Sequence, residues 1–239
     1  MKWFLEKSGA KDGDSTAQLL GVAIHALAAM VMKDPTLDAP RAIESLTKAW
    51  GVVDQNVGWY KRAQLESASE MLRRFFTWNQ ANDRVLLAVE KDFMIRVGRA
   101  VIRGQVDRLE ASADGTSLHI VDLKTGKTPT TKIETLDHRQ LKAYQLAVVM
   151  DGFDLPDSER ITEITHTGGA ELLFLAKDTQ KVTAQAQPPI IREEVEADIS
   201  AIAEGMAAAT FTARANKRCS TCAVAALCPL QSAGRSVIE

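Results

Sequence analysis

The fold is decided by residues 104–127, which read GQVDRLEASADGTSLHIVDLKTGK. Apolar and β-branched side chains alternate in Val101–Leu109 and again in Leu118–Lys124, and this pattern predicts two β-strands. Between them, Ala113-Asp114-Gly115 is typical of a tight hairpin turn. We therefore expect an antiparallel pair of strands at the centre of the protein.

The hairpin also predicts where three charged side chains lie. Side chains alternate across a strand, so Asp122 and Lys124 point to the same side, and Asp107 on the facing strand can lie close to Asp122. Two carboxylates repel each other unless a cation sits between them, and oxygen ligands favour Mg²⁺ or Mn²⁺. A single Asp-x-Lys is more often a pair of solvated surface charges, so these residues alone leave both interpretations open.

The pattern of helices and strands extends on both sides of this hairpin. Residues before it are largely helical in pattern, with breaks at Pro35 and Pro40. The expected helices are Leu19–Met32, Arg41–Trp50, Ala63–Trp78, Leu136–Met150 and Ile191–Ala209, and the further strands are Leu86–Glu90, Phe93–Val97 and Glu171–Leu175.

This order of elements predicts an α/β fold with a mixed central sheet flanked by helices and a helical N-terminal region. We expect residues 1–239 to form a single domain. Within it we distinguish a helical region at 1–84, an α/β core at 85–184, and a C-terminal helix with a cysteine-containing tail at 185–239. Gln185–Pro189 is the segment that we expect to be an exposed loop.

The composition narrows the class of protein without naming its ligand. The chain has 29 Lys and Arg against 31 Asp and Glu, for a net charge of -2. This balance is neutral on nucleic-acid binding, because carboxylates that hold a metal can offset basic residues elsewhere. No apolar run is long enough to cross a membrane, and the polar start does not resemble a signal peptide. A cytoplasmic protein without membrane contact is expected.

Five short motifs, in this order, resemble those of the RecB-like branch of the PD-(D/E)XK nuclease superfamily. None of them is specific alone, but together they span nearly the whole chain. They are GVAIH at 21–25, GQVDR at 104–108, VDLKTGK at 121–127, QLKAY at 140–144, and the C-terminal cysteines Cys219, Cys222 and Cys228. The resemblance implies a PD-(D/E)XK restriction-endonuclease-like core for this chain.

The resemblance also implies roles at the metal site. Lys124 would be the catalytic lysine, and Glu90 would be the family's additional acidic residue, which supports the metal through water. The implied metal ligands are His25, Asp107, Asp122 and the backbone carbonyl of Leu123. Without the resemblance, His25 on an apolar helix would more often be a core histidine.

Four further residues are expected near the substrate. Gln140 and Tyr144 lie one helical turn apart on a shared face, and the resemblance implies that they line the catalytic site or contact the DNA backbone. Arg108 and Lys127 are candidates for phosphate contacts, although both are equally consistent with ordinary surface charges.

Cys219, Cys222 and Cys228 fall within ten residues of one another, which favours metal or iron–sulfur ligation over disulfides. Zinc and cubane clusters need four ligands, and three free thiols remain the alternative. In the iron–sulfur nucleases the first cysteine lies far upstream, before a segment like Trp3-Phe4-Leu5-Glu6. We therefore expect a 4Fe-4S cluster to be absent or labile in this chain, which resembles either an excised domain that begins just after the missing ligand or a variant that lost it.

These observations predict a Mg²⁺- or Mn²⁺-dependent deoxyribonuclease, with exonuclease action favoured over endonuclease action. The resemblance implies the nuclease domain of a DNA-end-processing helicase–nuclease in recombinational repair, with DNA and a helicase region or partner subunit as its partners. Two alternatives stay open at this point. One is a free-standing exonuclease of the CRISPR-adaptation type, and the other is a catalytically silent DNA-binding or scaffold module.

Overall fold

Helices precede and follow a central run of strands in the computed structural model. It describes residues 16–53, 58–155, 166–176, 181–208, 213–216, 219–222 and 225–231. The helices are α2 (Thr16–Ala29), α3 (Ala39–Val53), α4 (Trp59–Ala81), α5 (Lys132–Leu136), α6 (Arg139–Val149) and α7 (Arg192–Ala207), and the 3-10 turns are η1 (Met30–Met32), η2 (Cys219–Thr221) and η3 (Ala225–Leu227).

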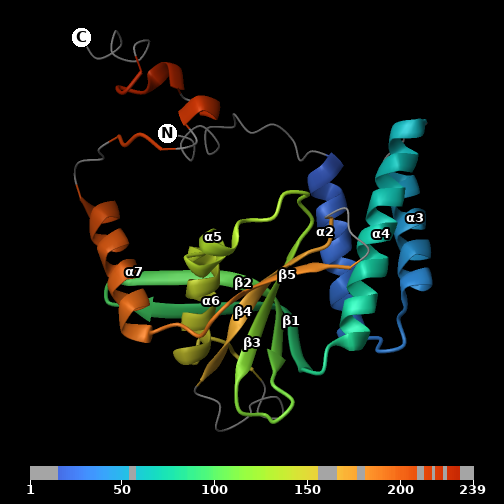
Figure 1. The fold of residues 1–239 in the computed structure, drawn as a ribbon, viewed down its shortest axis with the longest axis horizontal. Helices are drawn as coiled ribbons and strands as arrows, with labels where there is room; N and C mark the ends of the chain where they lie inside the picture. Colours follow the sequence, from blue (N-terminus) through green and yellow to red (C-terminus); the bar gives the residue numbers. More distant parts are fainter. Residues whose placement is uncertain are drawn as a thin grey trace. The chain divides into compact units, whose positions relative to one another are not determined.

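The strands of the described residues form one mixed sheet in the order β1-β2-β3-β4-β5 (Figure 1). The pairs β1–β2, β2–β3 and β4–β5 are antiparallel, whereas β3 and β4 run parallel. A parallel pair needs a crossover connection, and helices α5 and α6 lie in it. The strands are β1 (Val85–Val97), β2 (Ala100–Ala111), β3 (Leu118–Lys124), β4 (Thr167–Phe174) and β5 (Thr183–Gln187).

The central strands of the sheet are buried on both faces, because their successive side chains enter different cores. Ile120 of β3 and Leu172 of β4 pack in the core that contains helix α6. Their neighbours Val121 and Leu173 pack in a second core with side chains of α2, α3 and α4. Continuous apolar runs are typical of strands covered on both sides. The sheet is therefore a rigid middle layer from which polar side chains at the strand ends are positioned.

The α/β fold with a mixed sheet and a helical N-terminal region is confirmed. Three details differ from the predictions. Leu86–Glu90 and Phe93–Val97 belong to one strand, β1. The helix predicted at Leu136–Met150 corresponds to α6, and the short helix α5 before it was not predicted. Gln185–Pro189 is not an exposed loop, because β5 extends to Gln187, whose amide is buried and donates to the Thr135 carbonyl at 2.9 Å.

The chain divides into two compact units. The larger unit is Ala17–Ser200 and carries the whole sheet, and the other combines Met1–Thr16 with Ala201–Glu239. The expected single domain with its three regions stays a prediction. Of the helices in the described part of the chain, none combines the length and the apolar character that a membrane crossing requires.

Candidate active site

The β2–β3 hairpin places Asp107 beside Asp122 of strand β3. The two strands pair in the register Arg108↔Val121, so the next position along sets Asp107 level with Asp122. The pairing of the two strands ends at Arg108 and Val121. Beyond it, Asp107 Oδ2 accepts a hydrogen bond from the backbone N–H of Leu123 at 2.6 Å. This bond fixes the carboxylate at the strand end and leaves its Oδ1 free for other contacts.

Helix α2 places His25 beside the Asp107 carboxylate. His25 Nδ1 lies 3.2 Å from Asp107 Oδ1, within hydrogen-bond distance. One turn earlier, Gly21 is buried, and a Cβ at this position would lie only 3.0 Å from the Thr125 hydroxyl oxygen. A glycine therefore lets the helix approach the end of β3 closely enough for the imidazole to reach Asp107. This contact gives a physical reason for the spacing between Gly21 and His25.

Glu90 reaches the site from an irregular point in strand β1. Its backbone has a φ of 46°, which is rare for a residue with a side chain. The flanking pairs Val89↔Arg108 and Lys91↔Val106 place it level with Asp107, and the Gln105 side-chain amide donates to its carbonyl at 3.0 Å. Left-handed backbone at such a position is strained and is typical of functional sites. The distortion turns the Glu90 carboxylate toward the histidine.

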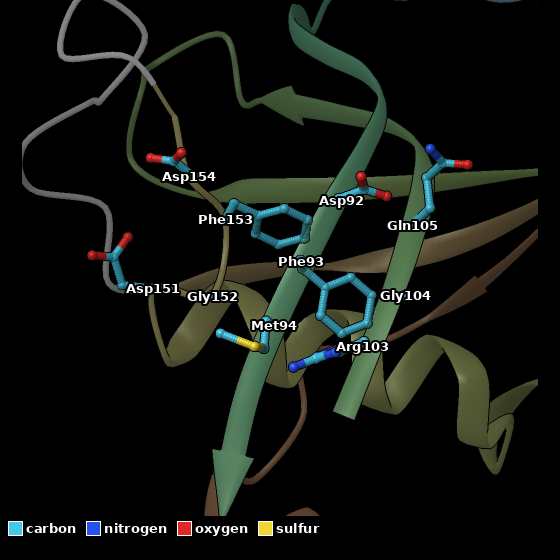
Figure 2. A pocket seen from close by; sticks show the side chains of 10 residues that line it. All are labelled: Asp92, Phe93, Met94, Arg103, Gly104, Gln105, Asp151, Gly152, Phe153 and Asp154. Atoms are coloured by element: carbon cyan, nitrogen blue, oxygen red, sulfur yellow. The ribbon is translucent and has the colours of Figure 1, made fainter. Parts of the chain in front are cut away.

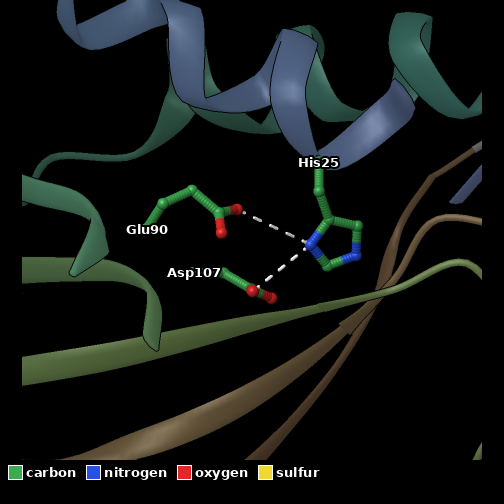
Figure 3. Close-up of side chains that lie close together, drawn as sticks. All are labelled: His25, Glu90 and Asp107. Carbon is green, nitrogen blue, oxygen red and sulfur yellow. Dashed lines mark hydrogen bonds and ion pairs between the residues drawn. The ribbon is translucent and has the colours of Figure 1, made fainter. Parts of the chain in front are cut away.

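The three side chains form a group that fits a divalent cation (Figure 3). One ligand atom each from His25, Glu90 and Asp107 lies within 4.8 Å of the others, and Glu90 Oε1 is 3.9 Å from His25 Nδ1. Burial and the nearby charge of Asp107 raise the pKa of Glu90. Burial alone lowers the pKa of His25, but the hydrogen bond and charge of Asp107, with Glu90 and Asp122, raise it overall. Clustered acids that resist ionisation favour a cation between them.

Asp122 and Lys124 form an ion pair next to this group. Lys124 Nζ lies 2.5 Å from Asp122 Oδ2, and the Asp122 side chain is 4% exposed while that of Lys124 is 31% exposed. Burial raises the pKa of Asp122, and the lysine charge opposes this effect. Because the carboxylate is anchored inside the protein, the ammonium is held at the surface of the site by a fixed partner.

Helix α6 adds Gln140 and Tyr144 to the same site. Lys124 Nζ donates to Gln140 Oε1 at 3.4 Å, and Gln140 Nε2 donates to the Tyr144 hydroxyl at 2.6 Å. Burial and the charge of Asp122 raise the pKa of Tyr144 to about 12, so its hydroxyl keeps its proton at neutral pH. The ring of Phe93 packs edge-on against Tyr144, with centroids 5.6 Å apart. A Cβ at Gly104 would clash with the Phe93 ring at 2.7 Å, so this packing requires the glycine of the GQVDR motif.

Comparison with known proteins shows to which superfamily the chain belongs. The family model of the PD-(D/E)XK nuclease superfamily matches residues 1–229. The chain belongs to this superfamily. No curated protein matches the sequence. Among solved structures, the chain is similar to "Crystal structure of SSO0001", with 15% identity and a TM-score of 0.40, over 96% of this chain and 94% of that one.

Nucleases of this superfamily use divalent metals, and the residues present suit one. Carboxylate oxygens are the donors that Mg²⁺ and Mn²⁺ prefer. The closely grouped atoms come from His25, Glu90 and Asp107, and Asp122 is ion-paired beside them. The resemblance implies an indirect role for Glu90, through water, and the sequence itself shows only an acid just upstream of the predicted strand Phe93–Val97. That Asp122 and the Leu123 carbonyl are ligands stays a prediction.

Arg108 does not lie where the superfamily's DNA substrate could reach it, which corrects its predicted phosphate contact. The residue is 3% exposed. Its guanidinium donates to Glu110 Oε1 and Asn79 Oδ1, both at 2.9 Å, and lies over the rings of Phe75 and Trp78. Its role is therefore to neutralise a buried glutamate. Lys127 is exposed, and its predicted contact with phosphate stays a prediction.

Cys219 begins the 3-10 turn η2, Cys222 follows it, and Cys228 follows the turn η3. Cys219 and Cys228 are partly buried, Cys222 is exposed, and all three thiols are free. Among the described residues they are not part of a group of His, Cys, Asp or Glu close enough to hold a metal. The Trp3–Glu6 segment, before which the resemblance places a fourth ligand, lies outside the described residues.

Proposed function

We propose that this protein is a Mg²⁺- or Mn²⁺-dependent deoxyribonuclease of the RecB-like branch, and that it cuts DNA as an exonuclease. One observation carries the proposal: His25, Glu90 and Asp107 converge within 4.8 Å beside the ion pair of Lys124 and Asp122. The order of the five motifs supports the RecB-like assignment and, with it, exonuclease action.

His25, Glu90 and Asp107 would hold the cation, with Asp122 at its side. When bound, the cation supplies positive charge where negative charge develops on the phosphodiester oxygens. The hydrogen bond from the Leu123 N–H to Asp107 Oδ2, at 2.6 Å, keeps Asp107 in one orientation. The bent backbone of Glu90 and the close approach at Gly21 orient the other two groups. The protein thus arranges its ligands before the substrate binds.

Lys124 is the residue that acts on the reacting atoms. Its ammonium faces the site from a fixed position, because Asp122 Oδ2 lies 2.5 Å away and Gln140 Oε1 accepts a hydrogen bond from it at 3.4 Å. From there it can donate to the attacking water or to a phosphate oxygen. Water adds to phosphorus, the P–O bond to the leaving oxygen breaks, and that oxygen takes a proton. Tyr144, which stays protonated, offers a second donor to the phosphate.

The proposed biological role is DNA-end processing in recombinational repair, as the nuclease part of a helicase–nuclease. The resemblance supports this role through the iron–sulfur branch, whose members join such nuclease domains to a helicase region or partner subunit. Cys219, Cys222 and Cys228 would supply three ligands of a 4Fe-4S cluster. With three ligands only, the cluster would be absent or labile.

The test is a nuclease assay on labelled linear DNA with Mn²⁺ or Mg²⁺, comparing the parent with Asp107→Asn and Lys124→Ala. Cutting by the parent, its loss with EDTA, and its loss in both variants are the expected results. The matched control is Arg73→Ala, on helix α4, whose side chain is 48% exposed and pairs only with glutamates of its own helix. Cutting that persists in EDTA or in Asp107→Asn would contradict the proposal.

A further inference from the structure

The β1–β2 hairpin has an exposed face that continues from the site. Three cross-strand pairs lie on it: Asp92↔Gln105, Met94↔Arg103 and Arg96↔Val101. All six side chains are exposed, whereas the intervening Phe93, Ile95 and Val97 are buried. Alternation along paired strands puts residues of this kind on one shared face. The face is therefore a continuous surface that no other described element covers.

This face carries more positive charge than the chain as a whole. Arg96 and Arg103 lie on the strands and Arg99 lies in the turn that joins them, and all three are exposed. Among the described residues, none of the three forms an ion pair. The one acid on the exposed face is Asp92, in a chain whose net charge is -2. Free guanidinium groups on a two-stranded ribbon are suited to contact phosphates.

Beside this face lies a cavity of about 820 Å³, which Figure 2 shows from close by. The rings of Phe93 and Phe153 line its interior, and Met94 and Arg103 border it on the hairpin side. Asp151 and Asp154 border it on the opposite side. These carboxylates exclude a phosphate from the cavity, but they can accept hydrogen bonds from the amino groups of bases. The cavity thus suits an unstacked base rather than the backbone of DNA.

The arginine-bearing face and the metal group belong to the same strands. Arg103 is four residues from Asp107 on β2, a distance of about 13 Å along an extended strand. The Arg96↔Val101 pair is two residues farther out, so its distance from Asp107 is about 20 Å. A polynucleotide with one phosphate at the metal group can therefore continue along the hairpin without leaving the protein.

We propose that the exposed face of the β1–β2 hairpin, with Arg96, Arg99 and Arg103, binds the backbone of single-stranded DNA and guides it to the active site. This inference rests on the proposed nuclease function and names its substrate form. Phosphates lie along the three arginines, and bases contact Met94, Val101 and the cavity. A duplex would offer only its phosphates to the hairpin and would leave these apolar side chains and the cavity uncovered.

The test measures binding without cleavage. Fluorescence anisotropy in EDTA follows a labelled oligodeoxycytidylate about twenty nucleotides long, whose bases carry amino groups and whose length exceeds one typical binding site. The variant combines Arg96→Gln, Arg99→Gln and Arg103→Gln. The control removes three exposed cations from helices α3 and α4, with Lys48→Gln, Arg62→Gln and Arg73→Gln. A second variant, Arg99→Gln alone, changes only a turn residue and guards against a folding defect in the triple variant.

We expect the triple variant to bind at least about tenfold more weakly and the control to bind like the parent. The slope of log affinity against log salt should fall by about 2 in the triple variant, since each phosphate contact on a single strand contributes about 0.7, and by about 0.7 in Arg99→Gln. Parent-like affinity and slope in the triple variant would overturn the proposal, as would an equal loss in the control or a parent that does not bind.

Duplex DNA of the same length decides the substrate form. The proposal expects weaker binding of the duplex by the parent and a smaller loss on substitution, and equal binding and equal loss would overturn the single-strand assignment. The readout does not depend on cutting. If the triple variant binds more weakly but the parent never cuts DNA, the nuclease proposal alone is contradicted. If the parent cuts DNA but the triple variant binds like the parent, the hairpin proposal alone is contradicted.

Discussion

Asp107 and Arg108 are neighbours on strand β2, but they belong to two charge clusters with different purposes. The buried cluster contains Arg108 and Glu110 of β2 together with Arg84 and Glu171. The site cluster contains Asp107, His25, Glu90, Asp122 and Lys124. Strand β2 therefore contributes residues to both clusters. The difference between the two clusters distinguishes charges that stabilise the fold from charges that can bind a ligand.

The buried cluster matches every carboxylate with a guanidinium. Glu110 is fully buried and accepts from Arg108 at 2.9 Å and from Arg84 at 3.0 Å, while the Asn82 amide lies 3.0 Å from both of its oxygens. Arg84 also pairs with Glu171. Burial lowers the pKa of Arg108, and the charge of Glu110 opposes that effect. Such a network needs no further ligand, which makes it a structural feature.

The site cluster leaves negative charge unmatched. Lys124 pairs with Asp122, so Glu90 and Asp107 share only the imidazole of His25. Burial raises the pKa of both Glu90 and Asp122, which means that the free protein resists full ionisation there. A divalent cation would relieve this repulsion. Carboxylates without a cationic partner of their own, rather than carboxylates in general, therefore distinguish the candidate site from the buried cluster.

The largest expected effect is on stability, from Glu110→Ala in the buried cluster. Removing the glutamate leaves the Arg108 guanidinium buried without its main partner, which costs about 3–5 kcal/mol. Denaturant unfolding followed by circular dichroism should show this loss. A change of less than about 1 kcal/mol would mean that the cluster is solvated in solution, because exposed ion pairs contribute no more than that.

The next effect is on catalysis, from Lys124→Ala in the site cluster. Loss of one donor to the developing charge typically lowers the rate by about 10²–10³. Some stability should be lost as well, because the Asp122 side chain, which is 4% exposed, is left without its ion-pair partner. Single-turnover cleavage measures the rate, and a melting curve of the same sample checks the fold. If Glu110→Ala, where folded, lowers the rate as much as Lys124→Ala does, the two clusters are not separate.

The third effect concerns pH. The pKa of His25 is raised above 6.5, so its protonated form stabilises the metal-free protein at low pH, and this contribution is lost as pH rises through the raised pKa. A metal needs the neutral imidazole, so Mn²⁺ affinity should rise with pH through the same range, by at most about tenfold per pH unit. Titration calorimetry measures it, and His25→Asn should flatten the profile. A flat profile in the parent would remove His25 from the ligand set.

The smallest effect is expected from Arg73→Ala, an exposed charge in neither cluster. Its partners Glu66 and Glu70 are on its own helix, and such pairs contribute about 0–1 kcal/mol. Denaturant unfolding should therefore detect almost no change, and cleavage should be unaltered. A loss as large as that of Glu110→Ala would show that burial does not separate structural charges from surface charges here.

The sequence predicted the hairpin and the closeness of Asp107, Asp122 and Lys124 because these depend on local patterns. The roles proposed for the other site residues came from the resemblance. Alternation and the Asp114-Gly115 turn define β2 and β3, and the spacing from Asp122 to Lys124 puts both side chains on one face. Arg108 was misplaced because its partner Asn79 is 29 residues away in the sequence, and the pattern of β2 does not show which face helix α4 covers.

Other features depend on contacts that no short motif encodes. The importance of Glu90 comes from its backbone φ of 46° and from His25, which is far upstream. Strand β5 reads TAQAQ, with no β-branched apolar residue. It is held by hydrogen bonds from side-chain amides, such as the one that Gln187 donates to the Thr135 carbonyl. Helix α5 had a local signal that was missed: Thr131 and Glu134 form a capping box at its start.

Direct binding of Mn²⁺ tests the central claim, that the unmatched acids of the site hold a divalent cation. Electron spin resonance of free Mn²⁺ during titration gives the affinity of the parent, of Asp107→Asn and Glu90→Gln, and of Arg73→Ala. We expect binding by the parent and by Arg73→Ala, with affinity reduced by about tenfold or more in each site variant, as is usual when support for a metal is lost. Parent-like affinity in Asp107→Asn and Glu90→Gln would contradict it.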